Sequence, residues 1–281
     1  MKPYVICHMV ASVDGRILHS RWRPRTRDGG DLFERLHTRL GGDAWLVGRV
    51  TGQEFAKARG YEAHTDRTYP REPWLVRGDA DRIVLGTATP GAKFSDGAYG
   101  VVLDAHGKIA WGRPEIGGDP IVVVLTERVS AAHLAGLRQD GVSYFFAGEN
   151  ELDLDAALEF LNRELGVKRL LIEGGGGSNG SFLRAGLVDE ISLAICPAVD
   201  GAKGAPSVFD SRAEESDLRA PIAELSLASC EVLEGGAVWL RYRVRSEKLP
   251  RQHDHDTRRD PAQPDALGVG AHFKHHKRDD E

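Results

Sequence analysis

The sequence contains little cysteine. Cys7, Cys196 and Cys230 are its only three, and each lies in a separate apolar run. No Cys-x-x-Cys pair is present, which argues against a common tetrahedral zinc site and against a thioredoxin-type redox centre. Isolated cysteines in apolar runs are typical of buried small hydrophobic side chains in a reducing compartment. We therefore expect a cytoplasmic protein with three buried thiols and no bound metal.

The chain also lacks a long hydrophobic run and an excess of basic side chains. No apolar stretch approaches the roughly 18 residues that a membrane-spanning helix needs. The N-terminal apolar run is broken by His8, Ser12 and Asp14, which is a poor signal-peptide pattern. The 37 basic side chains are outnumbered by 42 acidic ones, for a formal net charge of −5. A nucleic-acid binder would show a basic stripe, so we expect neither nucleic acid nor membrane as a partner.

The composition changes after about residue 245. Residues 246–281 hold 15 charged side chains, five histidines and one aromatic ring in 36 positions. Such a segment cannot bury enough apolar surface to offset the entropy lost on ordering. The sequence therefore predicts a folded domain over residues 1–245 and a charged, His-containing disordered tail over 246–281. The tail histidines could bind a metal or recruit a partner.

Residues 1–245 alternate between strand and helix patterns. Short β-branched and apolar runs indicate strands, and apolar residues at helical spacing indicate helices. Strands are predicted over 4–10, 44–47, 100–104, 121–125, 142–146 and 169–173, and helices over 31–40, 130–139 and 153–165. Residues 57–98 are rich in Gly, Arg and Asp, and we interpret them as a long excursion that could form a flap over a site.

The pattern changes again after about residue 180. A short helix is expected over 180–185, and then only strands, over 190–196, 222–230 and 237–245, with a hairpin signal at 233–236. The chain thus begins as β-α-β units and ends as antiparallel strands. This order predicts an α/β fold with a mixed, mostly parallel sheet, helices on both faces and C-terminal antiparallel strands.

A run of four glycines is the most informative stretch. Gly174, Gly175, Gly176 and Gly177 follow a predicted strand and precede a predicted helix. Glycines let backbone N–H groups approach a phosphate closely, and a helix N-terminus favours its negative charge. Ser178 or Asn179 could cap the helix and add a donor. The alternative is a flexible strand–helix turn that binds nothing.

Two better-known phosphate motifs do not account for this run. The glycines satisfy Gly-x-Gly-x-x-Gly, and Asp200 lies 20 residues after Gly180, as in a dinucleotide-binding Rossmann unit. However, too few β-α units follow to complete a Rossmann sheet. No Gly-Lys-Ser/Thr is present, which excludes a Walker loop.

Two other strand ends carry residues suited to phosphate. Gly48, Arg49 and Thr51 lie where a strand passes into a helix, so Thr51 could cap that helix while Arg49 supplies a positive charge. Thr126 and Arg128 close a third strand in the same manner. Three such strand ends predict one crevice at the carboxyl edge of the sheet.

Four motifs together resemble the reductase domain of bacterial riboflavin-biosynthesis deaminase-reductases. They are Ala11-Ser12-Val13-Asp14-Gly15-Arg16-Ile17, Asp43-Ala44-Trp45-Leu46-Val47-Gly48-Arg49-Val50-Thr51, Leu171-Ile172-Glu173-Gly174-Gly175-Gly176, and Ala185-Gly186-Leu187-Val188-Asp189-Glu190 with Pro197 and Gly201. The resemblance spans residues 4 to about 245. The wider superfamily has the dihydrofolate reductase fold, so the resemblance implies a dihydrofolate reductase-like domain that acts as an NADPH-dependent reductase.

The resemblance implies a cofactor site for NADPH. Gly48, Arg49 and Thr51 would lie along its phosphates, and Thr126 and Arg128 would lie near the adenosine 2′-phosphate. The run from Gly174 to Gly177 would clasp the pyrophosphate, with Ser178 beside it. The resemblance also implies a homodimer, formed through the late antiparallel strands, whose Val- and Leu-rich pattern leaves an edge to cover.

Three carboxylates are candidate catalytic residues. Asp14 and Glu173 match family carboxylates that face the substrate or the nicotinamide. Asp31 opens a predicted helix and is similar in placement to the acid of dihydrofolate reductases. Any of the three could orient or protonate a ring nitrogen or ribose oxygen, and an acid that acts near neutral pH needs a pKa raised by burial.

The sequence departs from the resembled family in two places. The zinc deaminase half is absent, and Gly52–Lys57 stands where the family carries an Asp-x-Pro-x-Leu-x-x-Arg segment assigned to the substrate phosphate; Pro73–Arg77 is only a loose echo of it. The substrate therefore stays open between a pyrimidine ribosylamine and a pterin-like compound, and Trp22–Arg27 could form a different substrate lip. Dihydrofolate reductase-type activity and a non-catalytic NADP-binding sensor remain alternatives, as does an assembly protein that recruits partners through its tail.

Overall fold

The strand and helix patterns build one large sheet with helices packed on it. In the computed structural model, residues 1–25, 29–61, 65–76, 97–211, 215 and 217–247 are described. All but the first two residues of the expected tail lie outside these ranges, so its predicted disorder stays a prediction. Residues Met1–Lys248 group by their contacts into one unit, and the account below concerns that unit.

The strands follow the predicted ranges closely. They are β1 (Tyr4–Ser12), β2 (Ala44–Gly48), β3 (Ala58–Arg59), β4 (Tyr99–Leu103), β5 (Ile109–Ala110), β6 (Glu115–Ile116), β7 (Asp119–Leu125), β8 (Ser143–Phe146), β9 (Arg169–Ile172), β10 (Glu190–Cys196), β11 (Ile222–Val232) and β12 (Val238–Ser246). The helices are η1 (His19–Arg21), α1 (Gly29–Leu40), α2 (Arg49–Phe55), α3 (Ala131–Asp140), α4 (Leu154–Leu165), α5 (Gly176–Arg184) and η3 (Glu234–Gly236), the last forming the hairpin turn between β11 and β12.

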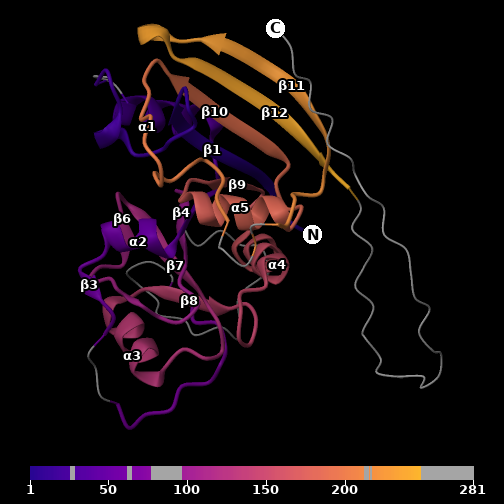
Figure 1. Ribbon diagram of the computed structural model, residues 1–281. Helices are drawn as coiled ribbons and strands as arrows, with labels where there is room; N and C mark the ends of the chain where they lie inside the picture. Colours follow the sequence, from indigo (N-terminus) through magenta and orange to yellow (C-terminus); the bar gives the residue numbers. More distant parts are fainter. Residues whose placement is uncertain (26–28, 62–64, 77–96, 212–214, 216, 248–281) are drawn as a thin grey trace, which may run out of the picture. The chain divides into compact units, whose positions relative to one another are not determined.

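The sheet is mostly parallel, which confirms the predicted fold class. Its order is β11-β12-β10-β1-β9-β2-β4-β7-β6, with β8 also paired to β7 (Figure 1). All pairs from β10 through β1, β9, β2 and β4 to β7 and β8 are parallel. We expected the chain to turn antiparallel at 190–196, but β10 is parallel to β1, and the reversal comes at β12. The direction of a strand is set by the strand with which it pairs. β10 pairs with the buried β1 and is parallel to it, and only its other neighbour, β12, is antiparallel.

Helices cover both faces of the sheet. Leu36 of α1 and Leu134 of α3 pack with Val123 on one face. Leu161 of α4 and Phe182 of α5 pack with Val124 on the other face. Because successive strand residues point to opposite faces, the apolar run of β7 serves both cores. Among the described residues, no helix is both long enough and apolar enough to cross a membrane.

Local signals in the sequence fix two of the helices. The Ser130 side chain accepts a hydrogen bond from the His133 N–H and caps α3, as predicted, and Gly141 ends that helix in the left-handed conformation. Asp153 caps α4 in the same way through the Ala156 N–H. Such caps satisfy backbone N–H groups that a helix start would otherwise leave without a partner.

One cysteine prediction is wrong. Cys7 and Cys196 are buried as expected, whereas Cys230 is exposed. Cys230 lies on β11, which forms the end of the sheet, and nearly every β11 residue is exposed. An apolar run in a strand therefore does not guarantee burial when the strand is at an edge.

The predicted excursion over 57–98 is partly folded onto the sheet. β3 pairs with β5, and Trp74 forms a main-chain bridge to Tyr144 of β8. The bridge covers the free side of β8 and buries the Trp74 ring. Residues 77–96, including Arg77, lie outside the described residues, so the predicted flap stays a prediction.

Candidate active site at the carboxyl edge of the parallel strands

The predicted phosphate-binding segments all follow the carboxyl ends of parallel strands. Gly48 ends β2, Glu173 follows β9 and Thr126 follows β7. Parallel strands end at the same edge of a sheet, so these segments share one edge. β9 and β2 are neighbours, whereas β4 separates β2 from β7. At the usual strand spacing, Thr126 is thus about 10 Å from Gly48 along the edge.

The ends of β2 and β9 are in direct contact. The Gly48 N–H donates a hydrogen bond of 2.7 Å to the Gly174 carbonyl. A Cβ on Gly48 would lie 2.0 Å from the Ser178 Oγ, and one on Gly175 would lie 3.5 Å from the Thr51 Oγ1. The structure therefore brings together the two segments that the sequence suggested separately, and the close approach explains why residue 48 lacks a side chain.

The glycine run is the first turn of α5 rather than a loop before it. The Asn179 N–H bonds to the Gly175 carbonyl at 3.1 Å, so helical bonding begins four residues earlier than the predicted start at 180. The prediction that Ser178 or Asn179 caps the helix is wrong, because Gly175 occupies the cap position without a side-chain bond. Instead, the buried Asn179 amide donates to the Val208 carbonyl at 2.8 Å.

Individual glycines of α5 have different surroundings. A Cβ on Gly176 would lie 2.2 Å from the Ser207 carbonyl, and one on Gly180 would lie 1.9 Å from the Asp210 carbonyl. These two glycines let the 207–210 loop pack against the helix. Gly177 differs, because no described atom lies within 4 Å of its Cβ position. The first turn thus has open space in front of Gly177. The first N–H groups of a helix have no partner within the helix, so an open first turn is an arrangement that binds an anion.

The start of α2 corrects the predicted role of Thr51. The helix begins at Arg49 with Gly48 at the cap position, so Thr51 lies within the first turn and does not cap it. Its hydroxyl instead faces the glycine run, near the Cβ positions of Gly174 and Gly175. Arg49 is exposed at the same helix end. Thr51 and Arg49 therefore both lie at the predicted site, but Thr51 contacts the glycine run and does not cap the helix.

The third segment splits into two roles. Thr126 is fully buried, and its hydroxyl donates a 2.7 Å hydrogen bond to the Ala105 carbonyl. This hydroxyl therefore holds the turn after β4, which differs from the predicted contact with a 2′-phosphate. Arg128 is exposed and donates to the Asn150 side chain. Of the pair, Arg128 is the residue that presents a charge at this edge.

Asp14 does not join Glu173. The register pairs Cys7 with Ile172, the last residue of β9, while β1 continues to Ser12. β1 therefore extends about 16 Å past β9. The exposed Asp14 accepts hydrogen bonds from the Ser12 hydroxyl at 2.6 Å and the Gly201 N–H at 2.9 Å. These bonds lower the pKa of Asp14 to about 2, so this carboxylate ties the loop after β1 to the loop after β10.

Trp22 cannot form part of the predicted substrate lip at Trp22–Arg27, because its side chain is not exposed. Trp22 is fully buried in the core beneath α1. The Arg23 guanidinium donates to the Trp22 carbonyl at 2.7 Å, and Arg21 pairs with Asp200 at 2.8 Å. Residues 26–28 lie outside the described residues. The large indole makes a core residue here because the loop after β1 folds back onto the sheet.

From α1, His37 rather than Asp31 reaches the site. Asp31 lies in the first turn with its side chain exposed, a position that the helix dipole favours for an acid. His37, about 9 Å further along the axis, places its Nδ1 2.7 Å from the Glu173 Oε1. His37 is not among the site residues predicted from the sequence. The available signal was its place on the apolar helix face, between Phe33 and Leu40.

The electrostatics of this pair follow from burial. The side chain of Glu173 is 6% exposed and that of His37 is 25% exposed. Burial raises the pKa of Glu173, although the hydrogen bond from His37 opposes the shift. The hydrogen bond to Glu173 raises the pKa of His37. Of the three candidate carboxylates, Glu173 is therefore the one with the environment of an acid that works near neutral pH.

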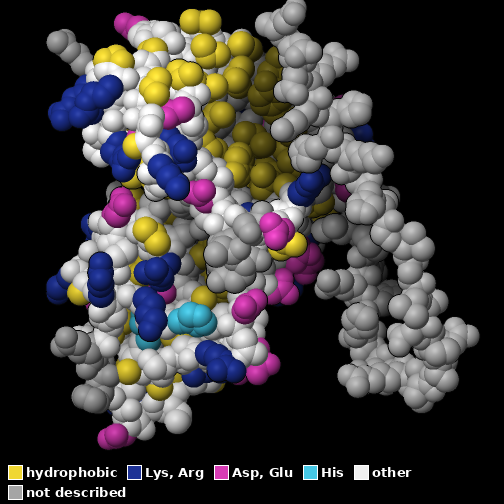
Figure 2. All heavy atoms as spheres, in the orientation of Figure 1, with side chains coloured by type: hydrophobic (Ala, Val, Ile, Leu, Met, Phe, Trp, Pro, Cys, Tyr) yellow, Lys and Arg dark blue, Asp and Glu magenta, His cyan; other side chains and the backbone are white. Residues whose placement is uncertain are grey.

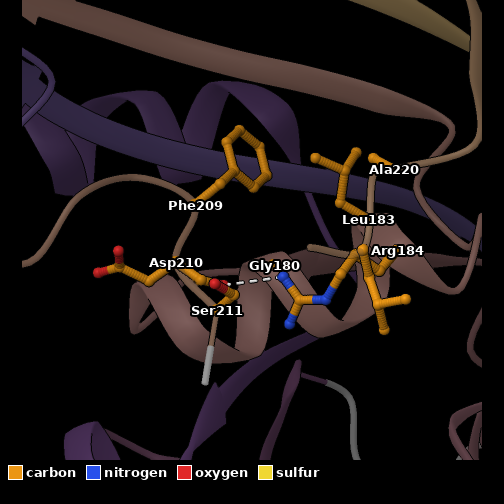
Figure 3. A pocket seen from close by; sticks show the side chains of 8 residues that line it. Gly180, Leu183, Arg184, Phe209, Asp210, Ser211 and Ala220 are labelled. Carbon is orange, nitrogen blue, oxygen red and sulfur yellow. Dashed lines mark hydrogen bonds between the residues drawn. The ribbon is translucent and has the colours of Figure 1, made fainter. Parts of the chain in front are cut away.

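A cavity of about 210 Å³ lies beside the second half of α5 (Figure 3). Its lining includes Leu183, Phe209 and Arg184. The Arg184 guanidinium donates to the Asp210 carbonyl at 3.1 Å and pairs with Glu215. Its charge is thus already balanced, so this cavity offers no free cation to an anionic ligand, in contrast to the open first turn of the same helix.

Comparison with known proteins places this geometry among reductases. The model of the RibD C-terminal domain family matches residues 3–239. The chain is 28% identical over 216 residues to the Archaeoglobus fulgidus protein named 2,5-diamino-6-ribosylamino-4(3H)-pyrimidinone 5′-phosphate reductase, covering 75% of this chain and 87% of that one. It is 27% identical over 213 residues to a protein of the same name from Methanothermobacter thermautotrophicus, covering 75% and 85%.

Solved structures show the same fold. A pyrimidine reductase-like protein from Corynebacterium diphtheriae has a TM-score of 0.59 at 17% identity, covering 87% of this chain and 93% of that chain. RibD from Acinetobacter baumannii has a TM-score of 0.53 at 17% identity, covering 87% of this chain and 58% of that chain. At these identities the structural likeness establishes the fold alone.

Proposed function

The chain belongs to the RibD C-terminal domain family, and from this premise we propose that it is an NADPH-dependent reductase that transfers hydride to a pyrimidine ribosylamine 5′-phosphate. It is an oxidoreductase of the riboflavin-pathway type, as are the relatives that match three quarters of it. One observation carries the choice of cofactor site: the contact of Gly48 and Thr51 with the glycine turn of α5. This contact forms a cradle for a dinucleotide phosphate at a helix N-terminus.

The residues present fit a nicotinamide dinucleotide. The open space at Gly177 and the first-turn N–H groups of α5 suit the pyrophosphate, with Ser178 and Thr51 beside it. Arg128 and Arg49 are exposed cations on the same edge, and we assign Arg128 to the adenosine 2′-phosphate. When bound, the cofactor supplies the hydride. The protein binds and orients both partners and supplies the proton.

Glu173 is the residue that we place at the reacting end. It directly precedes the glycine run, so a dinucleotide in the cradle passes close to it. Its backbone is fixed by the N–H bond to the Leu46 carbonyl at 2.8 Å. A buried carboxyl with a raised pKa can hold a proton near neutral pH and donate it to a substrate heteroatom. Asp14 and Asp31 take no part in this step.

Replacement of Arg49 by alanine is expected to weaken binding of both NADPH and NADH by about tenfold, the usual loss for one exposed phosphate contact. Arg128→Ala should weaken NADPH to a similar extent and leave NADH unchanged, because only NADPH carries the 2′-phosphate. Fluorescence titration of the purified protein with each cofactor measures both effects. Arg163→Ala, on the exposed side of α4, is the matched control. Failure of the wild type to bind either cofactor would overturn the proposal.

Turnover then separates the candidate functions. NADPH consumption that depends on 2,5-diamino-6-ribosylamino-4(3H)-pyrimidinone 5′-phosphate supports the proposed reductase. Consumption with dihydrofolate instead would indicate dihydrofolate reductase-type activity, and saturable binding without turnover on either substrate would indicate a sensor. Since Cys7 and Cys196 are free, we also propose a cytoplasmic location.

We propose that the protein is a homodimer joined through the hairpin of β11 and β12. The cross-strand register puts Leu225 opposite Val244 and Leu227 opposite Tyr242, so one face of the hairpin is apolar. Leu225, Leu227 and Val232 are 47%, 57% and 75% exposed. Figure 2 shows hydrophobic side chains gathered where Figure 1 places β10 and β12. An apolar sheet face of this kind is the usual mark of an interface, and a second copy covers it symmetrically.

Leu227→Glu is expected to convert the dimer into a monomer, because it places a charge on the apolar face. The side chain is more than half exposed, so the change should cost the monomer little stability. Light scattering after gel filtration measures the mass. Leu218→Glu, at a residue 63% exposed outside the hairpin, is the control that should keep the wild-type mass. A wild-type mass for Leu227→Glu would refute this interface.

A further inference from the structure

We propose that His37 is a positioning residue for the reduction: it orients the Glu173 carboxyl and returns to it, from solvent, the proton that each catalytic cycle consumes. The inference rests on the proposed function and deepens it. It gives a role to a side chain that lies 136 positions away from Glu173 in the sequence.

The geometry of the pair defines the contact. The Glu173 backbone is held on β2, and its carboxyl is almost fully buried. The hydrogen bond of 2.7 Å to the His37 Nδ1 therefore selects one orientation of the carboxyl. The His37 side chain is a quarter exposed, against 6% for Glu173. The imidazole ring of His37 thus connects the buried Glu173 carboxyl with solvent, since its Nδ1 is hydrogen-bonded to that carboxyl and the side chain is partly exposed.

The other charged groups that act on the His37–Glu173 pair, among the described residues, are acidic, so His37 is the group of this cluster that carries positive charge when protonated. Glu34 on α1 and Asp119 at the start of β7 both raise the pKa values of His37 and Glu173. His8 on β1 is fully buried, and burial lowers its pKa to about 4, so it stays neutral. The thiol of Cys7 is also buried, and burial raises its pKa. The proton of the pair therefore resides on His37 or Glu173.

The reaction needs such a proton. Hydride addition to an unsaturated substrate carbon breaks its π bond and leaves the electron pair on the attached heteroatom, which must take up one proton. A bound nicotinamide would supply the hydride as the two-electron reductant, and the substrate would gain that hydride and one proton. Glu173 gives that proton, and His37 passes the next one from solvent to the carboxylate. Without His37, the buried Glu173 carboxylate would have no neighbouring group, in the part of the chain that the structure describes, to return a proton to it from solvent.

Two substitutions separate the parts of this role. His37→Asn keeps a hydrogen-bond donor near the Nδ1 position but removes the titrating ring. His37→Leu removes both. We expect His37→Asn to lower kcat at pH 8 by about tenfold or more, with KM nearly unchanged, and to move the alkaline limb of the kcat profile to lower pH. His37→Leu should lower kcat further. A purely structural role would change stability or KM and leave the pH profile in place.

A second measurement does not depend on activity. In NMR titrations of the histidine rings, the pKa of His37 should fall in Glu173→Gln, because the hydrogen bond to the Glu173 carboxylate is what raises it. Wild-type kcat and pH profile in His37→Asn, in an enzyme that turns over, would overturn the inference alone. Absence of turnover by the wild type would overturn the proposed function and the inference with it, and a shifted His37 titration would then identify a structural pair only.

Discussion

Gly177→Val should weaken dinucleotide binding by roughly a hundredfold while the protein stays folded. No described atom lies within 4 Å of the Gly177 Cβ position, so the folded chain accommodates a side chain there. The same space is where we place the cofactor pyrophosphate, and valine would hold its oxygens away from the helix N–H groups. Loss of two charge-assisted hydrogen bonds costs about 3 kcal/mol, which corresponds to roughly a hundredfold in affinity. Fluorescence titration with NADPH measures the loss of affinity, and a thermal unfolding curve shows whether the variant is folded.

The matched substitution one residue earlier should act on the fold. A Cβ on Gly176 would lie 2.2 Å from the Ser207 carbonyl, a backbone atom that moves only if the loop moves. Gly176→Ala is therefore expected to lower the free energy of unfolding by about 1–3 kcal/mol, as overpacking usually does. If Gly177→Val bound NADPH as tightly as the wild type, the pyrophosphate would have to lie elsewhere on the sheet edge.

His133→Leu is expected to stabilise the protein, and more so in acid. His133 lies on α3 with 3% exposure, and neither ring nitrogen has a hydrogen-bond partner among the described residues. Removal of these unsatisfied groups should gain about 1–2 kcal/mol at pH 7.5. Burial lowers the pKa of His133 to about 4, whereas in the unfolded chain the ring has its ordinary pKa of 6.5.

The sign of the pH effect follows from linkage. The neutral ring is favoured in the folded state, so its contribution to stability is complete above pH 6.5 and is lost as the pH falls toward 4. The wild type should lose up to about 3 kcal/mol in this window through His133, and His133→Leu should not. Urea unfolding at a series of pH values measures the difference. His106→Leu, on the surface, is the control, and a pH-independent gap between His133→Leu and the wild type would refute the account.

The sequence predicted most of the architecture because its signals are local. The apolar run of 121–125 and the Ser130 cap each specify an element without help from distant residues. The meeting of Gly48 with Gly174 was also predictable in outline, since parallel strands end at one edge. These features need only the period of the apolar residues and the order of the elements.

Features that depend on distant contacts could not be predicted. The start of α5 was placed four residues late because a glycine run has low helix propensity, whereas packing against the 207–210 loop favours the helix. The pairing of Glu173 with His37 joins segments that no local pattern connects. The resemblance indicates Asp31 by its placement alone, whereas the rotation of α1 about its axis decides that the His37 side chain is the one that reaches Glu173.

The carboxyl edge of the sheet is stepped. β1 and β10 run on together to Ser12 and Cys196, while β9 and β2 stop short beside them. The glycine cradle thus sits on the lower step, and the loops held by Asp14 sit on the upper one. The two levels are held in different ways. The lower one depends on glycines that let the ends of β2 and β9 touch, and the upper one depends on a single carboxylate that ties two loops together. A substitution of Asp14 should therefore loosen the upper loops and leave the contact between Gly48 and Gly174 intact.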